Sequence, residues 1–156
     1  MTKDIDLEQV MALAIRGEED AKDYYLSVAR EVGNELAKAK FEALAKEEDS
    51  HRMMLLYMYK RLSGRDSVPT VKGSPKTHEE HSFVPRPNTM EGIVELALER
   101  ERQAQRFYKD LAAKVDDDKV RRVLEYLADI ERGHEVSLEA ELNALRRDAD
   151  WYAKGI

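Results

Sequence analysis

Two short stretches of this sequence place a glutamate three residues before a histidine. The first is KEEDSH, which holds Glu48 and His51, and the second is DIERGH, which holds Glu131 and His134. Residues three apart share a face of a helix, so each pair could offer a carboxylate and an imidazole to a metal ion. A single pair of this kind in a glutamate-rich chain is more often solvated surface, so the spacing alone does not establish a metal site.

The two stretches belong to an internal repeat. Residues 6–62 align without a gap with residues 89–145. Apolar identities such as Leu44/Leu127 show only that both halves bury a similar stripe. Helix amphipathicity does not require the polar identities, so an internal duplication and a two-fold symmetric site are predicted. These polar pairs are Glu18/Glu101, Tyr25/Tyr108, Glu48/Glu131 and His51/His134.

Composition and apolar periodicity predict an all-α protein of a single domain, residues 1–156. Helix-forming residues dominate, and apolar residues recur at intervals of three and four. All four prolines lie in residues 65–88, which we predict as a long crossover connection. Two antiparallel helical hairpins joined in this way describe a four-helix bundle. The predicted helices cover about 6–32, 34–62, 89–115 and 118–147.

Residues with helix-capping chemistry mark the expected helix ends. Asp6 is an N-cap candidate and begins a capping-box pattern, while Asn34 and Thr89 stand in the same place before the second and third helices. Gly33 and Gly64 follow the first two helices, where a glycine can adopt the left-handed conformation that ends a helix.

The hairpin geometry should bring the glutamates of the repeat to one level. Glu18 and Glu48 are equally distant in sequence from the first hairpin turn, near residue 33. At about 1.5 Å of rise per residue, both lie roughly 22 Å from that turn. Glu101 and Glu131 have the same relation to the second turn. Four carboxylates and two imidazoles are therefore predicted to meet in one layer of the core.

Four ionised carboxylates in an apolar layer require compensating charge. Two divalent cations would supply it and leave neutral imidazoles as the remaining ligands. Nitrogen and oxygen ligands of this kind suit iron or manganese, and zinc binds them without redox chemistry. One glutamate from each of two helices, with Glu-x-x-His from each of the others, is the di-iron carboxylate pattern of helical bundles.

The sequence resembles the rubrerythrin branch of the ferritin-like superfamily across essentially the whole bundle. The stretches EEDAKDYY (18–25) and ERQAQRFY (101–108) both read E-x-x-A-x-x-[FY]-Y, and each is followed by E-x-x-H. The resemblance implies a di-iron centre that reduces peroxide or oxidises ferrous iron with dioxygen or peroxide. It also implies Glu48 and Glu131 as bridging carboxylates. The implied iron ligands are Glu18, Glu48, His51, Glu101, Glu131 and His134.

Two departures from the family pattern limit what the resemblance implies. Full rubrerythrins carry a rubredoxin-like domain with four cysteines, whereas this sequence has none, so an external electron donor such as a rubredoxin-type protein is expected. Many members also carry an extra glutamate close after the third-helix ligand, where this chain has Ala104. Glu99 is nearby but should point away from the site.

Other residues around the expected centre have less specific signals. Tyr25 and Tyr108 should face the same interior, either as hydrogen-bond partners of the metal ligands or as ordinary core aromatics. Glu47, next to a ligand candidate, is predicted to be solvated surface. The crossover residues His78 and His81 could bind a surface metal, although an exposed segment favours solvation.

Charge and hydropathy exclude several classes of function. The net charge of -6, without a concentrated basic patch, argues against a general nucleic-acid binder. No apolar run is long enough for a membrane span and the first residues have no signal-peptide pattern, so a cytoplasmic protein is expected. The apolar stretch MMLLYMY (53–59) predicts a homodimer interface or a face beneath the crossover. Trp151 and Tyr152 are expected to dock on the bundle end.

Two alternatives to an oxidoreductase stay open at this point. One is an iron-storage protein of bacterioferritin type. Asp49 stands where bacterioferritins place a haem-ligating methionine. The residues after the fourth helix are too few for the short fifth helix of ferritin cages. Both features disfavour a storage protein. The other is a metal-free structural bundle derived from an enzyme.

Overall fold

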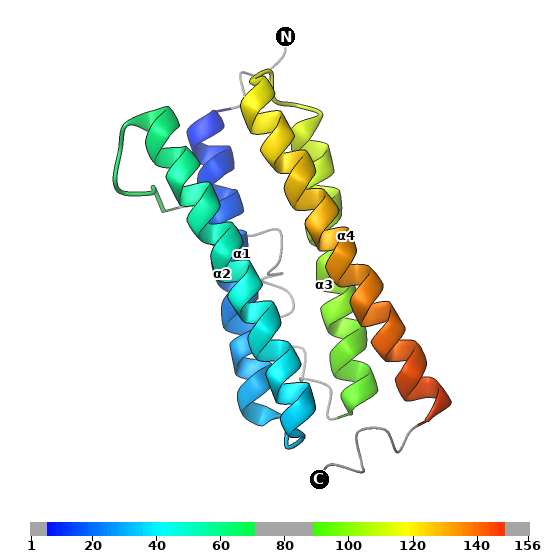
Figure 1. Cartoon of the computed structure of the whole chain (residues 1–156). Helices are drawn as coiled ribbons and strands as arrows, with labels where there is room; N and C mark the ends of the chain where they lie inside the picture. Colours follow the sequence, from blue (N-terminus) through cyan, green and yellow to red (C-terminus); the bar gives the residue numbers. More distant parts are fainter. Residues whose placement is uncertain (1–5, 71–88, 149–156) are drawn as a thin grey trace.

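The computed structural model describes residues 6–70 and 89–148, which form four helices joined as two hairpins. The ribbon in Figure 1 shows each hairpin as a pair of antiparallel helices. Helix α2 ends at the end of the bundle opposite to the one where α3 begins, as the predicted crossover requires. The fold is therefore the predicted four-helix bundle. The helices are α1 Leu7–Glu31, α2 Glu35–Ser63, α3 Met90–Ala112 and α4 Asp118–Arg147.

Side-chain caps begin all four helices. The carboxylate of Asp6 accepts hydrogen bonds from two backbone amides of α1, at 3.1 and 3.4 Å. Asn34 and Thr89 cap α2 and α3 as predicted, and Asp117 caps α4. Gly64 ends α2 with φ 69°, in the left-handed region. Gly33 does not adopt that region, because α1 ends at the extended residue Val32 before the glycine is reached.

Helix α3 ends at Ala112, three residues before the position that the apolar pattern indicates. Its last turn tightens, with the amide of Lys114 bonded to the carbonyl of Leu111 at 3.0 Å. Val115 still reaches the core and is only 5% exposed. The side chain therefore continues the apolar stripe although its backbone has left the helix.

The apolar core consists of two clusters separated by a polar layer. One cluster gathers the beginnings of α1 and α4 and the ends of α2 and α3, and includes Met11, Tyr59 and Leu124. The other gathers the opposite ends of the same helices and includes Phe41 and Leu138. Along every helix, the glutamates and histidines of the expected site fall between the two clusters. Burial of both clusters stabilises the bundle on either side of the polar layer.

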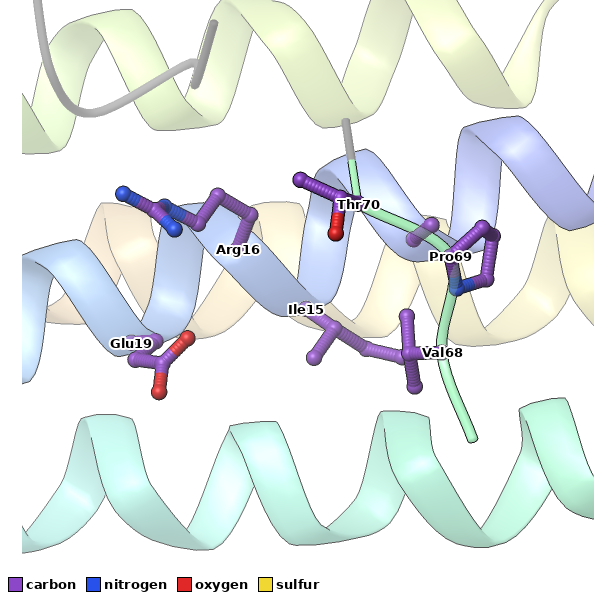
Figure 2. Close-up of a pocket in the computed structure, with 7 residues that line it drawn as sticks. Ile15, Arg16, Glu19, Val68, Pro69 and Thr70 are labelled. Carbon is purple, nitrogen blue, oxygen red and sulfur yellow. The ribbon is translucent and has the colours of Figure 1, made fainter. Parts of the chain in front are cut away.

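The beginning of the crossover packs along α1. Residues 68–70 run beside this helix and line an open pocket of about 180 Å³, as Figure 2 shows. The pocket contains none of the six ligand candidates, so it is distinct from the polar layer. It is lined by Ala12, Ile15, Arg16, Glu19, Val68, Pro69 and Thr70.

Several sequence expectations fall on residues that the structure does not describe. The proposed surface site at His78 and His81 and the docking of Trp151 and Tyr152 lie outside the described residues. Among the helices that are described, none is long and apolar enough to cross a membrane.

Candidate metal centre

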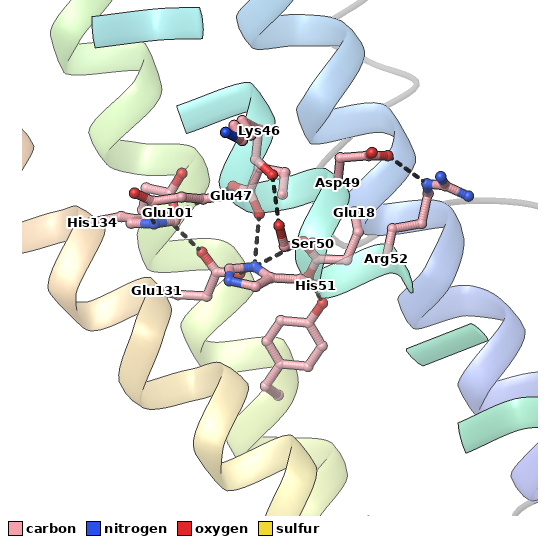
Figure 3. A network of polar contacts seen from close by, with 12 residues as sticks. Glu18, Lys46, Glu47, Asp49, Ser50, His51, Arg52, Glu101, Glu131 and His134 are labelled. Carbon is pink, nitrogen blue, oxygen red and sulfur yellow. Dashed lines mark hydrogen bonds and ion pairs between the residues drawn. The ribbon is translucent and has the colours of Figure 1, made fainter. Parts of the chain in front are cut away.

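The six residues singled out by the repeat come together in the layer between the two apolar clusters. Each of the four helices contributes one glutamate, and α2 and α4 each add a histidine one turn later. Figure 3 shows the residues of both hairpins converging on one region. All six are buried, and their exposed fractions are Glu18 0%, Glu48 0%, His51 7%, Glu101 1%, Glu131 0% and His134 6%.

Each histidine turns its Nδ1 atom toward the carboxylates. The Nδ1 of His51 lies 3.2 Å from an oxygen of Glu48, 3.4 Å from one of Glu18 and 3.9 Å from one of Glu131. The two imidazole rings stack with centroids 5.9 Å apart. His51 belongs to α2 and His134 to α4, so the stacked rings bring the two hairpins into contact at this layer.

The second histidine has the same kind of surroundings. The Nδ1 of His134 lies 3.3 Å from Glu131, 3.4 Å from Glu101 and 3.8 Å from Glu48. This nitrogen is buried, yet it makes no hydrogen bond within residues 6–70 and 89–148. A buried imidazole nitrogen that faces three carboxylate oxygens without a hydrogen bond fits a metal ligand.

The ligand atoms form two overlapping groups, each compact enough for one metal ion. Within each group the candidate ligand atoms lie within 4.8 Å of one another. Glu48 and Glu131 belong to both groups. A carboxylate has two oxygens, so a shared glutamate can reach two metal ions at once. The first group adds Glu18 and His51 to the shared pair, and the second adds Glu101 and His134.

Two buried tyrosines connect the hairpins at this layer. The hydroxyl of Tyr25 on α1 donates to Oε1 of Glu101 on α3, and the hydroxyl of Tyr108 on α3 donates to Oε1 of Glu18 on α1. Both rings are almost fully buried. The crossed pairs reproduce the two-fold relation of the repeat, and each tyrosine contacts a ligand candidate of the opposite hairpin.

The carboxylates control the protonation of both imidazoles. Burial of the His51 ring opposes protonation, but hydrogen bonding and charge from Glu18 and Glu48 outweigh it and raise the pKa of His51 to about 9. Burial likewise opposes protonation of His134, and Glu101 and Glu131 raise its pKa to about 11. Without metal, the imidazoles therefore carry positive charge at neutral pH and offset part of the charge of the glutamates.

The family model of rubrerythrin matches residues 9–142 of the chain. The chain belongs to the rubrerythrin family. Among curated proteins, none matches it. Among solved structures, a hypothetical protein from Pyrococcus furiosus is 29% identical, covers 92% of each chain and superposes with a TM-score of 0.72. A Thermotoga maritima protein described as a candidate ferritin-like diiron-carboxylate protein is 17% identical, with 93% of this chain and 97% of that chain covered and a TM-score of 0.67.

The likeness to the Thermotoga protein shows the ferritin-like fold. The buried glutamate and histidine cluster of this rubrerythrin-family chain fits metal binding, as the donor set and the two overlapping groups indicate.

Glu47 is not simple solvated surface, contrary to the sequence prediction. Its side chain is 57% exposed, yet Oε2 lies 2.5 Å from Nε2 of His134 on the facing hairpin. Glu99 does point away, since it accepts hydrogen bonds from Gln103 and Arg106 on the exposed side of α3. Helix spacing alone does not predict that Glu47 contacts the facing hairpin while Glu99 does not, because such a contact depends on how the hairpins pack.

Arg100 is a second neighbour that the sequence did not single out. Its guanidinium carbon lies 3.9 Å from the centroid of the Tyr24 ring, so it joins α3 to α1 beside the polar layer. Burial lowers the pKa of Arg100, and the charges of Asp20 and Glu101 oppose that shift. The residue that corresponds to Arg100 in the first half is Gly17, so the internal repeat does not mark Arg100 as a residue of the site.

Proposed function

We propose that this rubrerythrin-family chain is a di-iron oxidoreductase that reduces peroxide or dioxygen with electrons from an external donor. The observation that carries the proposal is the pair of overlapping buried groups that share Glu48 and Glu131. The shared glutamates would bridge two metal ions. The remaining ligands would be Glu18 and His51 for one ion, and Glu101 and His134 for the other.

Charge and ligand chemistry support iron as the metal. Two divalent ions would balance the four buried carboxylates, with both imidazoles neutral. Manganese and zinc accept the same ligands, but the di-iron pattern of ferritin-like bundles matches this arrangement of one glutamate per helix and two Glu-x-x-His turns. Family membership supports the same choice.

Side chains of the protein would position the metal ligands and exclude water from them. Two ferrous ions bound there would supply the two electrons that, with two protons from solvent, convert peroxide to water. The apolar clusters on both sides of the layer keep water from the ligands along the bundle axis. Tyr25 and Tyr108 hold Glu101 and Glu18 in place through their hydroxyl groups. A separate donor, such as a rubredoxin-type protein, would return the electrons, since the sequence has no cysteine for an iron–sulfur site.

We also propose a homodimer that forms through α2. Met53 and Tyr57 lie one turn apart on this helix and are 60% and 62% exposed. Large apolar side chains exposed next to each other mark protein interfaces. Sedimentation analysis should give a dimer, and Tyr57→Glu should shift it to monomer. An assembly of about 24 chains would instead support storage of bacterioferritin type.

The deciding experiment is anaerobic loading with ferrous iron, followed by stopped-flow mixing with peroxide and with dioxygen separately. About two iron ions per chain and faster oxidation by peroxide would support a peroxidase. Faster oxidation by dioxygen would support an oxidase or ferroxidase. Retention of less than about one-tenth of an equivalent of iron would overturn the metal centre, and loaded iron that reacts with neither oxidant would overturn catalysis.

Two substitutions on α3 provide a matched comparison for this experiment. Glu101→Gln changes a buried ligand candidate. Glu99→Gln changes a half-exposed glutamate two residues earlier on the same helix, which points away from the site. Glu101→Gln should reduce iron content and abolish the fast oxidation. Glu99→Gln should leave both unchanged, because its carboxylate bonds only to side chains on the outer side of α3.

A further inference from the structure

The Nε2 atom of His134 has a carboxylate partner, whereas the Nε2 atom of its repeat counterpart His51 has none among the described residues. The Nδ1 of His134 faces the buried glutamates, and Nε2 on the opposite side of its ring lies 2.5 Å from Glu47. Glu47 belongs to α2 and His134 to α4, so the contact joins the two hairpins. Figure 3 shows Glu47 and His134 beside Glu101.

The internal repeat supplies a comparison within the same molecule. The Nδ1 of His51 faces Glu48 and Glu18 at 3.2 and 3.4 Å, much as its counterpart faces its own glutamates. The residue that corresponds to Glu47 in the second half is Ile130, whose side chain accepts no hydrogen bond. In the part of the chain that the structure describes, no hydrogen bond or ion pair reaches Nε2 of His51.

We propose that Glu47 is a positioning residue that makes the two metal positions unequal. The position completed by Glu101 and His134 binds a divalent metal more tightly, and fills earlier, than the position completed by Glu18 and His51. The inference rests on the proposed function, since it assumes that both positions bind metal.

The physical reason lies in how an imidazole binds metal. An imidazole that ligates through Nδ1 carries its remaining proton on Nε2 and can donate it to a carboxylate. Such a partner fixes the ring orientation and raises the basicity of the ligating nitrogen, and its loss typically lowers metal affinity about 10–100-fold. Glu47 is placed to do this for His134, whereas Ile130 cannot do it for His51.

A simple surface ion pair is the competing explanation of the contact. Glu47 is half-exposed, and exposed ion pairs contribute little. An ion pair of that kind would slightly stabilise the protonated His134 of the metal-free protein, so its loss would leave metal affinity unchanged or slightly higher. The two explanations therefore differ in sign, because only a positioning role makes the loss of Glu47 weaken one metal site.

Zinc titration of the full chain by calorimetry provides the first test, because zinc takes these ligands without redox reaction. Wild-type protein should bind about two zinc ions per chain, and Glu47→Ala should weaken the tighter of the two about 10–100-fold. Glu47→Gln, which keeps the size and removes the charge, should produce a smaller loss. Ile130→Glu should strengthen the weaker position and bring the two affinities closer.

Histidine-selective nitrogen-15 NMR identifies which position fills. At one equivalent of zinc, the imidazole signals of His134 should shift before those of His51, and the Nε2 proton of His134 should exchange slowly. Both features should disappear in Glu47→Ala. If two zinc ions bind, both histidines shift together and Glu47→Ala changes neither affinity, the inference is overturned and the proposed function stands. If wild-type protein binds no zinc and no ferrous iron, the proposed function is overturned as well.

Discussion

Glu18 and Glu101 each use their two carboxylate oxygens differently. Oε1 accepts a hydrogen bond from a tyrosine of the opposite hairpin, and Oε2 lies 3.4 Å from the Nδ1 of a histidine. A carboxylate held at one oxygen has fewer orientations open to it. The tyrosines therefore limit the orientations of the carboxylates and would leave the second oxygen able to face a metal ion.

Removal of one such hydroxyl should destabilise the metal-free protein. Tyr108→Phe deletes a hydrogen bond to the buried carboxylate of Glu18, and loss of a bond to a charged group costs about 2 kcal/mol. Urea unfolding should show this decrease in the free energy of unfolding, with an unchanged slope. Tyr126→Phe is the control, since Tyr126 is 55% exposed. Equal stabilities for the two variants would contradict the hydrogen bond.

Metal binding should release protons from both histidines. With metal-free pKa values of about 9 for His51 and about 11 for His134, both imidazoles are protonated at pH 7. Each must lose its proton to bind metal, so zinc affinity should rise with pH, with two protons released below about pH 9 and one between about 9 and about 11. At pH 7 about two protons should be released per chain.

Calorimetry in buffers of different ionisation enthalpy measures that release directly. The apparent heat of zinc binding should change with the buffer in proportion to the protons released. His51→Gln should release about one proton fewer. A heat independent of the buffer would mean that the imidazoles are already neutral in the metal-free protein.

The ligand candidates were predictable from the sequence, whereas the Glu47 contact was not. Glu48 and His51 share a helix face because three residues nearly complete a turn, and the repeat marks the same pair again in α4. Glu47 lies one residue away, where the backbone directs the side chain aside. Its long side chain nevertheless reaches His134, and that reach depends on where the second hairpin packs.

At the scale of the helices, the starts were better determined by the sequence than one of the ends. A cap such as Asn34 bonds to amides two and three residues later, so it is a local feature. The end of α3 coincides with a contact from the next helix. Arg121 of α4 donates to the carbonyl of Val115 at 2.8 Å, just beyond the end of α3. Apolar periodicity alone cannot report such a contact.

The two glycines near helix ends should respond differently to alanine. Gly64 has φ 69°, which disfavours any residue with a Cβ atom, so Gly64→Ala should lower the free energy of unfolding by about 1 kcal/mol. Gly33 has no such φ and no atom within 4 Å of an added Cβ, so Gly33→Ala should be neutral or slightly stabilising.

Urea unfolding of both variants beside the wild type measures the difference. The space around Gly64 is also open, so any loss in Gly64→Ala reports the backbone conformation rather than a clash. If Gly64→Ala unfolds at the same urea concentration as Gly33→Ala, the left-handed end of α2 is not required.

For the whole molecule, the polar layer is the place where the two hairpins depend on each other. The Tyr25–Glu101 and Tyr108–Glu18 bonds join α1 to α3, and the Glu47–His134 contact joins α2 to α4. Ionised carboxylates this close repel one another, and two protonated imidazoles can balance the charge of only two of the four glutamates. Metal ions in this layer would remove the repulsion and bind ligands from all four helices.

Zinc should therefore raise the thermal stability of the whole bundle. Free zinc at about 1,000 times Kd stabilises the folded state by about 4 kcal/mol per site, and each kcal/mol raises Tm by roughly 2–4 °C in a domain of this size. Scanning calorimetry at pH 7 should show a rise of about 10 °C or more, reversed by a chelator. Glu131→Gln should lose most of this rise, because Glu131 belongs to both metal groups, whereas Glu99→Gln should retain it. The metal-free Tm of each variant is its own baseline, so a change in repulsion among the glutamates does not count as metal binding. An equal rise in Glu131→Gln and wild type would place the zinc elsewhere on the protein.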